Sequence, residues 1–237
     1  IIENAAREPE IEQLWIFLNK MGADISGVGT DKLIIKGVSQ LEPADIEVIP
    51  DRVEAGTFLM AGAALGEVTI NKIVPTHLRT VLIKLEETGA KVRTNQNSIT
   101  ITRSDKIIPV DMTTAVFPGF PTDLQAQWVA LMMLAEGSSV ITDTVYHDRF
   151  SHVPELNRLG ANIHVENNVA IIRGVKKLVG APVMSTDIRA SASLINGGLM
   201  AHGRTEVSRI YHIDRGYERI EEKFRLLGAD IMRKTES

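Results

Sequence analysis

The chain has 237 residues, of which 44% are hydrophobic and 24% charged, as is ordinary for a globular protein of one or two domains with a sizeable core. Its formal net charge of −4 and its lack of lysine and arginine runs argue against a nucleic-acid-binding protein. It has no cysteine, which excludes disulfides, thiolate metal sites and a cysteine nucleophile within these residues.

Membrane segments and targeting signals are not predicted. No apolar run reaches about 18 residues, and the first residues lack a basic segment followed by an apolar one. We therefore expect no membrane span, no signal peptide and a cytoplasmic location. The chain opens on Ile1-Ile2-Glu3-Asn4 rather than on methionine, and this stretch is typical of the end of a strand, so we expect a fragment of a longer protein.

A repeated pattern organises the chain. Four times, a helix is expected to end in leucine, a short stretch and Gly-Ala, with a strand following, over residues 18–25, 85–92, 156–163 and 226–231. The glycines recur roughly every 68 residues, and each stands where a helix commonly ends on a residue with positive φ. A period of this length is too long for a solenoid and suits a supersecondary unit of the βαβ type.

Each unit has the same expected order of elements. After Gly-Ala come a short strand, a polar turn and a second strand. An extended piece that ends in aspartate follows, then a helix rich in small residues, and then another strand that begins after glycine. The second strands are residues 33–38, 98–102 and 169–173; the helices include 55–64 and 190–198; the later strands are 66–70, 137–141 and 203–207. Small side chains let helices approach closely, so we expect buried helices inside a ring of sheets.

The repeats also divide the chain. Three complete units occupy residues 50–237, which we expect to form one domain with the catalytic face. Residues 1–49 are the back half of a fourth unit and are interpreted as the tail end of the preceding, N-terminal domain. The boundary is expected at residues 41–45.

An aspartate stands at the strand-to-helix corner of each complete unit, namely Asp51, Asp123 and Asp187. Asp123 follows the loop Phe117-Pro-Gly-Phe-Pro and has the position of an N-cap for a helix over residues 124–134, where the helix dipole favours its ionised form. Three helix N-termini at one end of the domain would form an electropositive mouth suited to anions.

Arginines are expected at the same end of the domain. Arg189 follows Asp187 by two residues, and Arg149 and Arg215 lie in later corners of the units. Guanidinium groups bind phosphate and carboxylate with paired hydrogen bonds. The sequence thus predicts an anion-binding face with an aspartate able to accept a proton; the alternative is that these residues form only caps and surface salt bridges. No metal site is predicted, because the histidines lack ligand spacing: His147, His152, His164, His202 and His212.

Six stretches carry a resemblance to a known family. The chain closely resembles the C-terminal part of the UDP-N-acetylglucosamine enolpyruvyl transferases (UDP-N-acetylglucosamine 1-carboxyvinyltransferases), which act in the first committed step of peptidoglycan synthesis. The matching stretches are Glu3-Asn-Ala-Ala-Arg-Glu-Pro-Glu10, Pro50-Asp-Arg-Val-Glu-Ala-Gly-Thr-Phe58, Phe120-Pro-Thr-Asp-Leu-Gln-Ala-Gln127, Arg149-Phe with His152-Val-Pro-Glu-Leu156, Thr186-Asp-Ile-Arg-Ala-Ser-Ala-Ser193, and Tyr211-His-Ile-Asp-Arg-Gly-Tyr-Glu-Arg-Ile220.

The resemblance implies an α/β fold, an inside-out barrel built from βαβαββ units, and a reaction. The enolpyruvyl group of phosphoenolpyruvate would move to the 3-hydroxyl of UDP-N-acetylglucosamine through a tetrahedral intermediate, with release of phosphate and without a cofactor. By resemblance, Asp123 would bind that hydroxyl and act as the general base, and Val145 would line the sugar-nucleotide site. The anions would be held by Arg149, Arg189 and Arg215. Two aspartates at the same end, Asp51 and Asp187, would assist domain closure or product release.

Two departures qualify the resemblance. An acidic residue is usual in the family where this chain has His147, so a role for that position is left open. The family's Lys-Asn motif, its mobile loop with a cysteine or aspartate acid, and most uridine contacts would lie before Ile1, in the N-terminal half of the same enzyme. We therefore expect this piece alone to be inactive. The alternatives are a 3-phosphoshikimate 1-carboxyvinyltransferase, against which Tyr211-His-Ile-Asp-Arg-Gly-Tyr217 argues, and a non-catalytic binding lobe.

Overall fold

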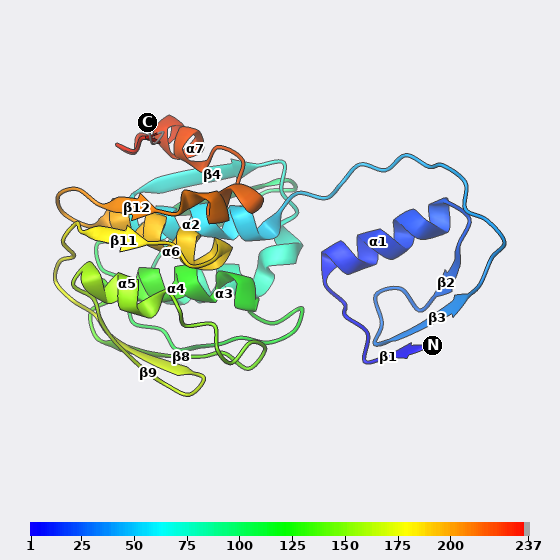
Figure 1. Ribbon diagram of the computed structural model, residues 1–237, viewed down its shortest axis with the longest axis horizontal. Helices are drawn as coiled ribbons and strands as arrows, with labels where there is room; N and C mark the ends of the chain where they lie inside the picture. The colour runs from blue at the N-terminus through cyan, green and yellow to red at the C-terminus, as the bar shows by residue number, and fades with distance from the viewer. Residues whose placement is uncertain (235–237) are drawn as a thin grey trace.

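The computed structural model describes residues 1–234 and has an α/β fold. Figure 1 shows a small body made by the first residues, joined by a long extended segment to a larger body that holds the rest of the chain. Among these residues no helix is long and apolar enough to cross a membrane. The last three residues of the predicted domain 50–237 lie outside the described residues.

The small body is one helix on a three-stranded antiparallel sheet of order β1-β3-β2. Pro9 stands in the first turn of the helix, where its missing N–H costs nothing, and Lys20 lies in the last turn. Residues 37–51, which contain the predicted boundary at 41–45, form no helix or strand. The elements are β1 (Ile2–Glu3), α1 (Pro9–Lys20), β2 (Asp24–Ser26) and β3 (Lys32–Lys36).

Three helices form the centre of the larger body and pack against one another: α2 (Arg52–Leu65), α4 (Gln125–Met132) and α6 (Ile188–Met200). Nearly all their residues are buried, and many are alanine, glycine or serine. Gly56 of α2 shows why small residues are needed, because a Cβ there would collide with the side chain of Leu124. The prediction of buried helices with sheets around them is confirmed.

Three sheets surround these helices, as Figure 1 shows. Two are built alike: strand order β4-β6-β5 is antiparallel, and order β7-β8-β10-β9 repeats it with β7 added parallel to β8. The third is the parallel pair β11-β12. The strands are β4 (Glu67–Asn71), β5 (Lys91–Thr94), β6 (Ser98–Thr102), β7 (Met112–Thr113), β8 (Ser138–Thr142), β9 (Asn162–Glu166), β10 (Val169–Arg173), β11 (Pro182–Met184) and β12 (Glu206–Ser208).

Shorter helices connect the strands, and α3, α5 and α7, like α1 of the small body, are each followed by one of the repeated glycines. The glycines Gly22, Gly89, Gly160 and Gly228 all have φ between 89° and 100°, so their predicted role at helix ends is confirmed. The helices are η1 (Pro75–Leu78), α3 (Arg79–Glu87), η2 (Thr122–Leu124), α5 (Val153–Arg158), η3 (Ile210–Arg215) and α7 (Ile220–Leu226).

The predicted strand after the fourth glycine is wrong for the described residues. Residues 229–234 form no strand, whereas β2, β5 and β9, which follow the first three glycines, each pair with the next strand along the chain. A strand needs a neighbour to satisfy its backbone N–H and C=O groups. Residues 229–234 have no such neighbour among the described residues, so they remain irregular.

Candidate active site

Asp123 lies between two arginines that come from different repeats. Nη1 of Arg149 donates to Oδ1 of Asp123 at 2.5 Å, and Nη2 of Arg189 donates to Oδ2 at 2.7 Å. The three side chains are partly buried, with exposed fractions of 35% for Asp123, 24% for Arg149 and 17% for Arg189. Hydrogen bonds between ionised partners are shorter and stronger than neutral ones, so this cluster fixes the position of the carboxylate.

These arginines also set the ionisation of Asp123. Burial by itself would raise the pKa of the Asp123 carboxyl, but the hydrogen bonds and charges of Arg189 and Arg149 outweigh it and lower the pKa. For Arg189, burial would lower the pKa, but the contact with Asp123 raises it. Asp123 is therefore ionised at neutral pH, and its charge is shared between two guanidinium groups.

The prediction that Asp123 caps a helix is wrong. It lies inside η2, and no side chain caps that helix, which follows Pro121. The carboxylate instead faces the two guanidinium groups, whose charge-assisted hydrogen bonds are stronger than those that backbone N–H groups offer a helix cap. The helix expected over residues 124–134 begins as η2 and continues as α4 only to Met132.

The other two corner aspartates are N-caps. Oδ1 of Asp51 accepts from the N–H groups of the second and third residues of α2, and Oδ1 of Asp187 does the same at α6. Burial alone would raise the pKa of Asp187, but the backbone N–H groups of Ala190 and Arg189 and the hydroxyl of Ser151 lower it. Their own carboxylates accept from these helix N-termini, so the positive charge beside Asp123 comes from Arg149 and Arg189 rather than from helix dipoles; the predicted anion binding at this end stays a prediction.

The loop after β8 carries two of the predicted site residues. Val145 is exposed at its start. Arg149 lies at its end, with the guanidinium 5.0 Å from the ring centroid of Tyr146 and with Nη1 also donating to the Thr122 hydroxyl at 3.2 Å. His147 is exposed in the turn between them.

Sequence reasoning missed Asp143, which anchors this loop. Its side chain is fully buried, and Oδ1 accepts from the N–H groups of Val145 and Tyr146 and from the Thr114 hydroxyl. An aspartate that directly follows a strand and begins a loop is typical of a side chain that binds backbone N–H groups. That signal identifies a loop anchor, but it does not reveal that Oδ2 of Asp143 also accepts from the Thr122 hydroxyl at 2.7 Å.

Arg215 is not brought to the Asp123 cluster by any contact. It ends η3, is exposed, and pairs with no acidic side chain among residues 1–234. Its neighbour Asp214 accepts two hydrogen bonds from Arg233, at 2.9 and 2.6 Å. The same segment continues to Tyr217, a buried residue whose hydroxyl lies 2.8 Å from the hydroxyl of Thr57 in α2. The predicted role of Arg215 stays a prediction.

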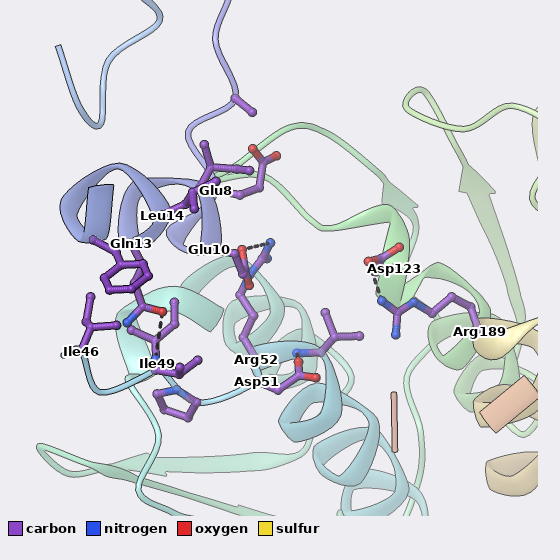
Figure 2. A pocket seen from close by; sticks show the side chains of 16 residues that line it. Glu8, Glu10, Gln13, Leu14, Ile46, Ile49, Asp51, Arg52, Asp123 and Arg189 are labelled. Atoms are coloured by element: carbon purple, nitrogen blue, oxygen red, sulfur yellow. Dashed lines mark hydrogen bonds and ion pairs between the residues drawn. The ribbon is translucent and has the colours of Figure 1, made fainter. Parts of the chain in front are cut away.

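A cleft of about 900 Å³ separates the small body from the larger one and reaches the cluster. Figure 2 shows Asp123 and Arg189 at one side of this cleft and helix α1 at the other, with Asp51 and Arg52 between them. The Nε of Arg52 donates to Glu10 of α1 at 2.8 Å, which links the two bodies across the cleft. A cleft of this size suits a ligand larger than a single small anion.

Comparisons with known proteins agree with this architecture. The model of the EPSP synthase (3-phosphoshikimate 1-carboxyvinyltransferase) family matches residues 1–224. Proteins named UDP-N-acetylglucosamine 1-carboxyvinyltransferase from Bdellovibrio bacteriovorus and Hydrogenovibrio crunogenus are 55% and 56% identical over 98% of the chain. The matches cover 57% and 56% of those proteins, so the chain spans about half the length of the curated relatives it matches.

Solved structures show the same fold. The enolpyruvyl transferase NikO from Streptomyces tendae superimposes with a TM-score of 0.87 at 29% identity, covering 96% of this chain and 55% of that one. An EPSP synthase from Acinetobacter baumannii gives a TM-score of 0.71 at 19% identity, covering 93% of this chain and 54% of the other, a likeness of fold alone. The predicted enolpyruvyl transferase fold is confirmed.

Proposed function

The chain belongs to the EPSP synthase (3-phosphoshikimate 1-carboxyvinyltransferase) family, and we propose that its protein transfers the enolpyruvyl group of phosphoenolpyruvate to the 3-hydroxyl of UDP-N-acetylglucosamine and releases phosphate. The observation that carries this proposal is the 55–56% identity to relatives named for that activity, together with an aspartate held between two arginines at a cleft. The reaction would serve peptidoglycan synthesis in the cytoplasm.

Asp123 has the properties of the base in this proposal. The sugar hydroxyl adds to C2 of phosphoenolpyruvate, and C3 takes up a proton, so that the hydroxyl proton must leave to an acceptor. Loss of a proton from C3 and of phosphate from C2 then restores the double bond. An ionised carboxylate at the cleft is such an acceptor. Arg149 and Arg189 would hold the phosphate and carboxylate groups of the substrate and intermediate.

The pairing with arginine makes Asp123 a weak base until the substrate arrives. Both of its oxygens contact a guanidinium group, which lowers its pKa. Anionic groups of phosphoenolpyruvate would compete for Arg149 and Arg189 and draw their charge away from the carboxylate. Its pKa would then rise toward the ordinary value, and the carboxylate would become a better proton acceptor at the moment of reaction.

Other predicted residues have supporting places in this proposal. Asp187 and Asp51 cap the helices that begin beside the cluster, and Arg189 is the second residue of the helix that Asp187 caps. Val145 would line the sugar-nucleotide site from its exposed loop. Arg215 would reach the substrate anions on closure of the cleft.

The small body would pack against the N-terminal half of the same enzyme. We propose residues 1–49 as the tail end of the preceding domain and residues 50–237 as the domain with the catalytic face. Large apolar side chains of the small body and its link are exposed, which supports a covering partner; they include Leu14, Ile16, Ile34, Ile35 and Val48.

Phosphate release tests the proposal. The full-length protein that carries this chain is given phosphoenolpyruvate with either UDP-N-acetylglucosamine or 3-phosphoshikimate, and turnover is expected only with the sugar nucleotide. Turnover only with 3-phosphoshikimate would instead establish the shikimate-type activity. Binding of the uridine nucleotide without turnover would leave a non-catalytic binding lobe. Residues 1–237 alone are expected to show no turnover above background.

A further inference from the structure

We propose that Thr122 is a positioning residue for this reaction, oriented by the buried carboxylate of Asp143, and that the pair aligns Asp123 with Arg149. The inference rests on the proposed function, because it concerns the groups assigned there to proton transfer and anion binding. Neither Thr122 nor Asp143 would touch the substrate. Their effect would reach the reaction only through the side chains that do.

Asp143 is fixed on every side. Its side chain is fully buried, and its backbone N–H donates to the carbonyl of Asn168 at 2.9 Å, while Nδ2 of Asn168 donates to the Asp143 carbonyl at 3.0 Å. The carboxylate accepts four hydrogen bonds, one of them from the hydroxyl of the fully buried Thr114 at 2.7 Å. A buried carboxylate with every contact satisfied is a rigid reference point in the site.

Thr122 connects this reference point to the cluster. Its hydroxyl donates to Oδ2 of Asp143 at 2.7 Å and accepts from Nη1 of Arg149 at 3.2 Å. A hydroxyl has one proton to donate, so its bond to Asp143 leaves only lone pairs for Arg149. The same Nη1 donates to Asp123, the next residue along the chain. The direction of the Thr122 hydroxyl therefore follows from Asp143, and it holds the guanidinium beside Asp123.

Asp143 also acts on Arg149 from the other side. Its Oδ1 accepts from the N–H groups of Val145 and Tyr146, at 3.0 and 2.8 Å, which folds the loop after β8. That loop places the Tyr146 ring 5.0 Å from the Arg149 guanidinium. Two of the contacts that hold Arg149, those with the Thr122 hydroxyl and the Tyr146 ring, thus depend on one buried carboxylate.

The test compares three variants of the full-length protein. Thr122→Val removes the hydroxyl at nearly constant size, and Thr122→Ser keeps it. Thr69→Val makes the same change at an exposed pair with Thr100 in the sheet of β4 and β6, whose strands contribute no residue to the Asp123 cluster. Because misplacement of reacting groups by about 1 Å can cost 10²-fold, we expect kcat of Thr122→Val to fall about 10- to 100-fold.

Two further readouts separate positioning from folding. Thr122→Ser is expected to recover kcat to within about threefold of the unchanged protein, and KM for phosphoenolpyruvate is expected to rise severalfold in Thr122→Val alone, since Arg149 is misaligned. Thr69→Val should match the unchanged protein in both. Thermal unfolding of the valine and serine variants should coincide; if Thr122→Val does not fold, Thr122→Ala provides the same comparison.

The outcomes distinguish this inference from the proposed function. Full turnover by Thr122→Val, in a protein whose unchanged form transfers the enolpyruvyl group, overturns the positioning role and leaves the function intact. An equal loss of kcat in the valine and serine variants also overturns it, because the hydroxyl would then not matter. An unchanged protein without any turnover overturns the proposed function, and with it the inference.

Discussion

Replacing Asp123 with asparagine tests the central assignment of the site. The amide keeps the size of the side chain but has almost no affinity for a proton, so it cannot accept one from the sugar hydroxyl. A positioned general base contributes about 10²- to 10⁴-fold to a rate. We therefore expect kcat of Asp123→Asn to fall by this factor, which corresponds to about 3 to 5 kcal/mol in the activation free energy.

The contacts of Asp123 predict that Asp123→Asn also lowers the stability of the protein but does not weaken the binding of phosphoenolpyruvate. The variant removes the negative charge that Arg149 and Arg189 share through bonds of 2.5 and 2.7 Å. After allowance for screening by solvent at these half-buried groups, we expect a loss of about 1 to 2 kcal/mol in the free energy of unfolding. The freed guanidinium groups should bind phosphoenolpyruvate as well as before or more tightly, so KM should stay constant or fall.

Steady-state phosphate release, with thermal unfolding measured beside it, checks both effects. Asp111→Asn is the matched control, because Asp111 is exposed and, among residues 1–234, its carboxylate accepts a hydrogen bond only from the backbone N–H of Val140, at 2.7 Å. The control should keep its turnover. A kcat of Asp123→Asn within tenfold of the unchanged protein would refute the role of Asp123 as base. A fall in kcat matched by an equal weakening of phosphoenolpyruvate binding would make its role structural.

Three further predictions concern stability. Burial lowers the pKa of His152 to about 4 from an ordinary 6.5, so the stability gained by keeping His152 neutral is complete above pH 6.5 and is lost as the pH falls toward 4. Lowering the pH from 7 to 4.5 should reduce the free energy of unfolding by about 2 kcal/mol through His152, and the His152→Leu variant should lack this contribution. Glu10→Ala removes the acidic partner of the nearly buried Arg52 and should lower the free energy of unfolding by about 1 to 3 kcal/mol, measured by denaturant unfolding. Adding Arg52→Met should restore most of this loss, and an equal loss in the double variant would show that the unpaired charge is not its cause. Gly56→Ala forces a methyl group into Leu124 and should cost about 1 to 3 kcal/mol in the same assay, whereas no change would mean that the contact yields.

The repeated architecture could be predicted because its signals are local. The strands expected over 98–102 and 169–173 have those bounds in the structure, and the four glycines have the positive φ expected of them. Alternating apolar residues and a glycine at a helix end act within a few residues of chain. The strand expected after Gly228 does not form in residues 229–234, because a strand needs a neighbouring strand to pair with, and the local sequence pattern does not show whether one is present.

The cluster itself could be predicted only in part. The sequence singles out Asp123, but its partners Arg149 and Arg189 lie 26 and 66 residues further along the chain, and their contact with Asp123 depends on tertiary packing. An aspartate before a helix is typical of an N-cap, and Asp51 and Asp187 follow that rule. Nothing in the sequence distinguishes the one corner at which guanidinium groups take the place of backbone N–H groups.

That one departure from the rule explains where the chemistry would be located. Three units of one design present an aspartate at the same corner, and two of these carboxylates are held by their own helices. Asp123 is left uncommitted by its helix, and its charge is balanced by Arg149 from its own unit and Arg189 from the next. A carboxylate bound by arginine side chains can be released when a competing anion binds those arginines, whereas one bound by a helix N-terminus cannot be released without breaking the helix start. Under the proposed function, and among the three corner aspartates of the described residues, Asp123 is therefore the one whose basicity would rise when an anionic substrate arrives and binds its arginines.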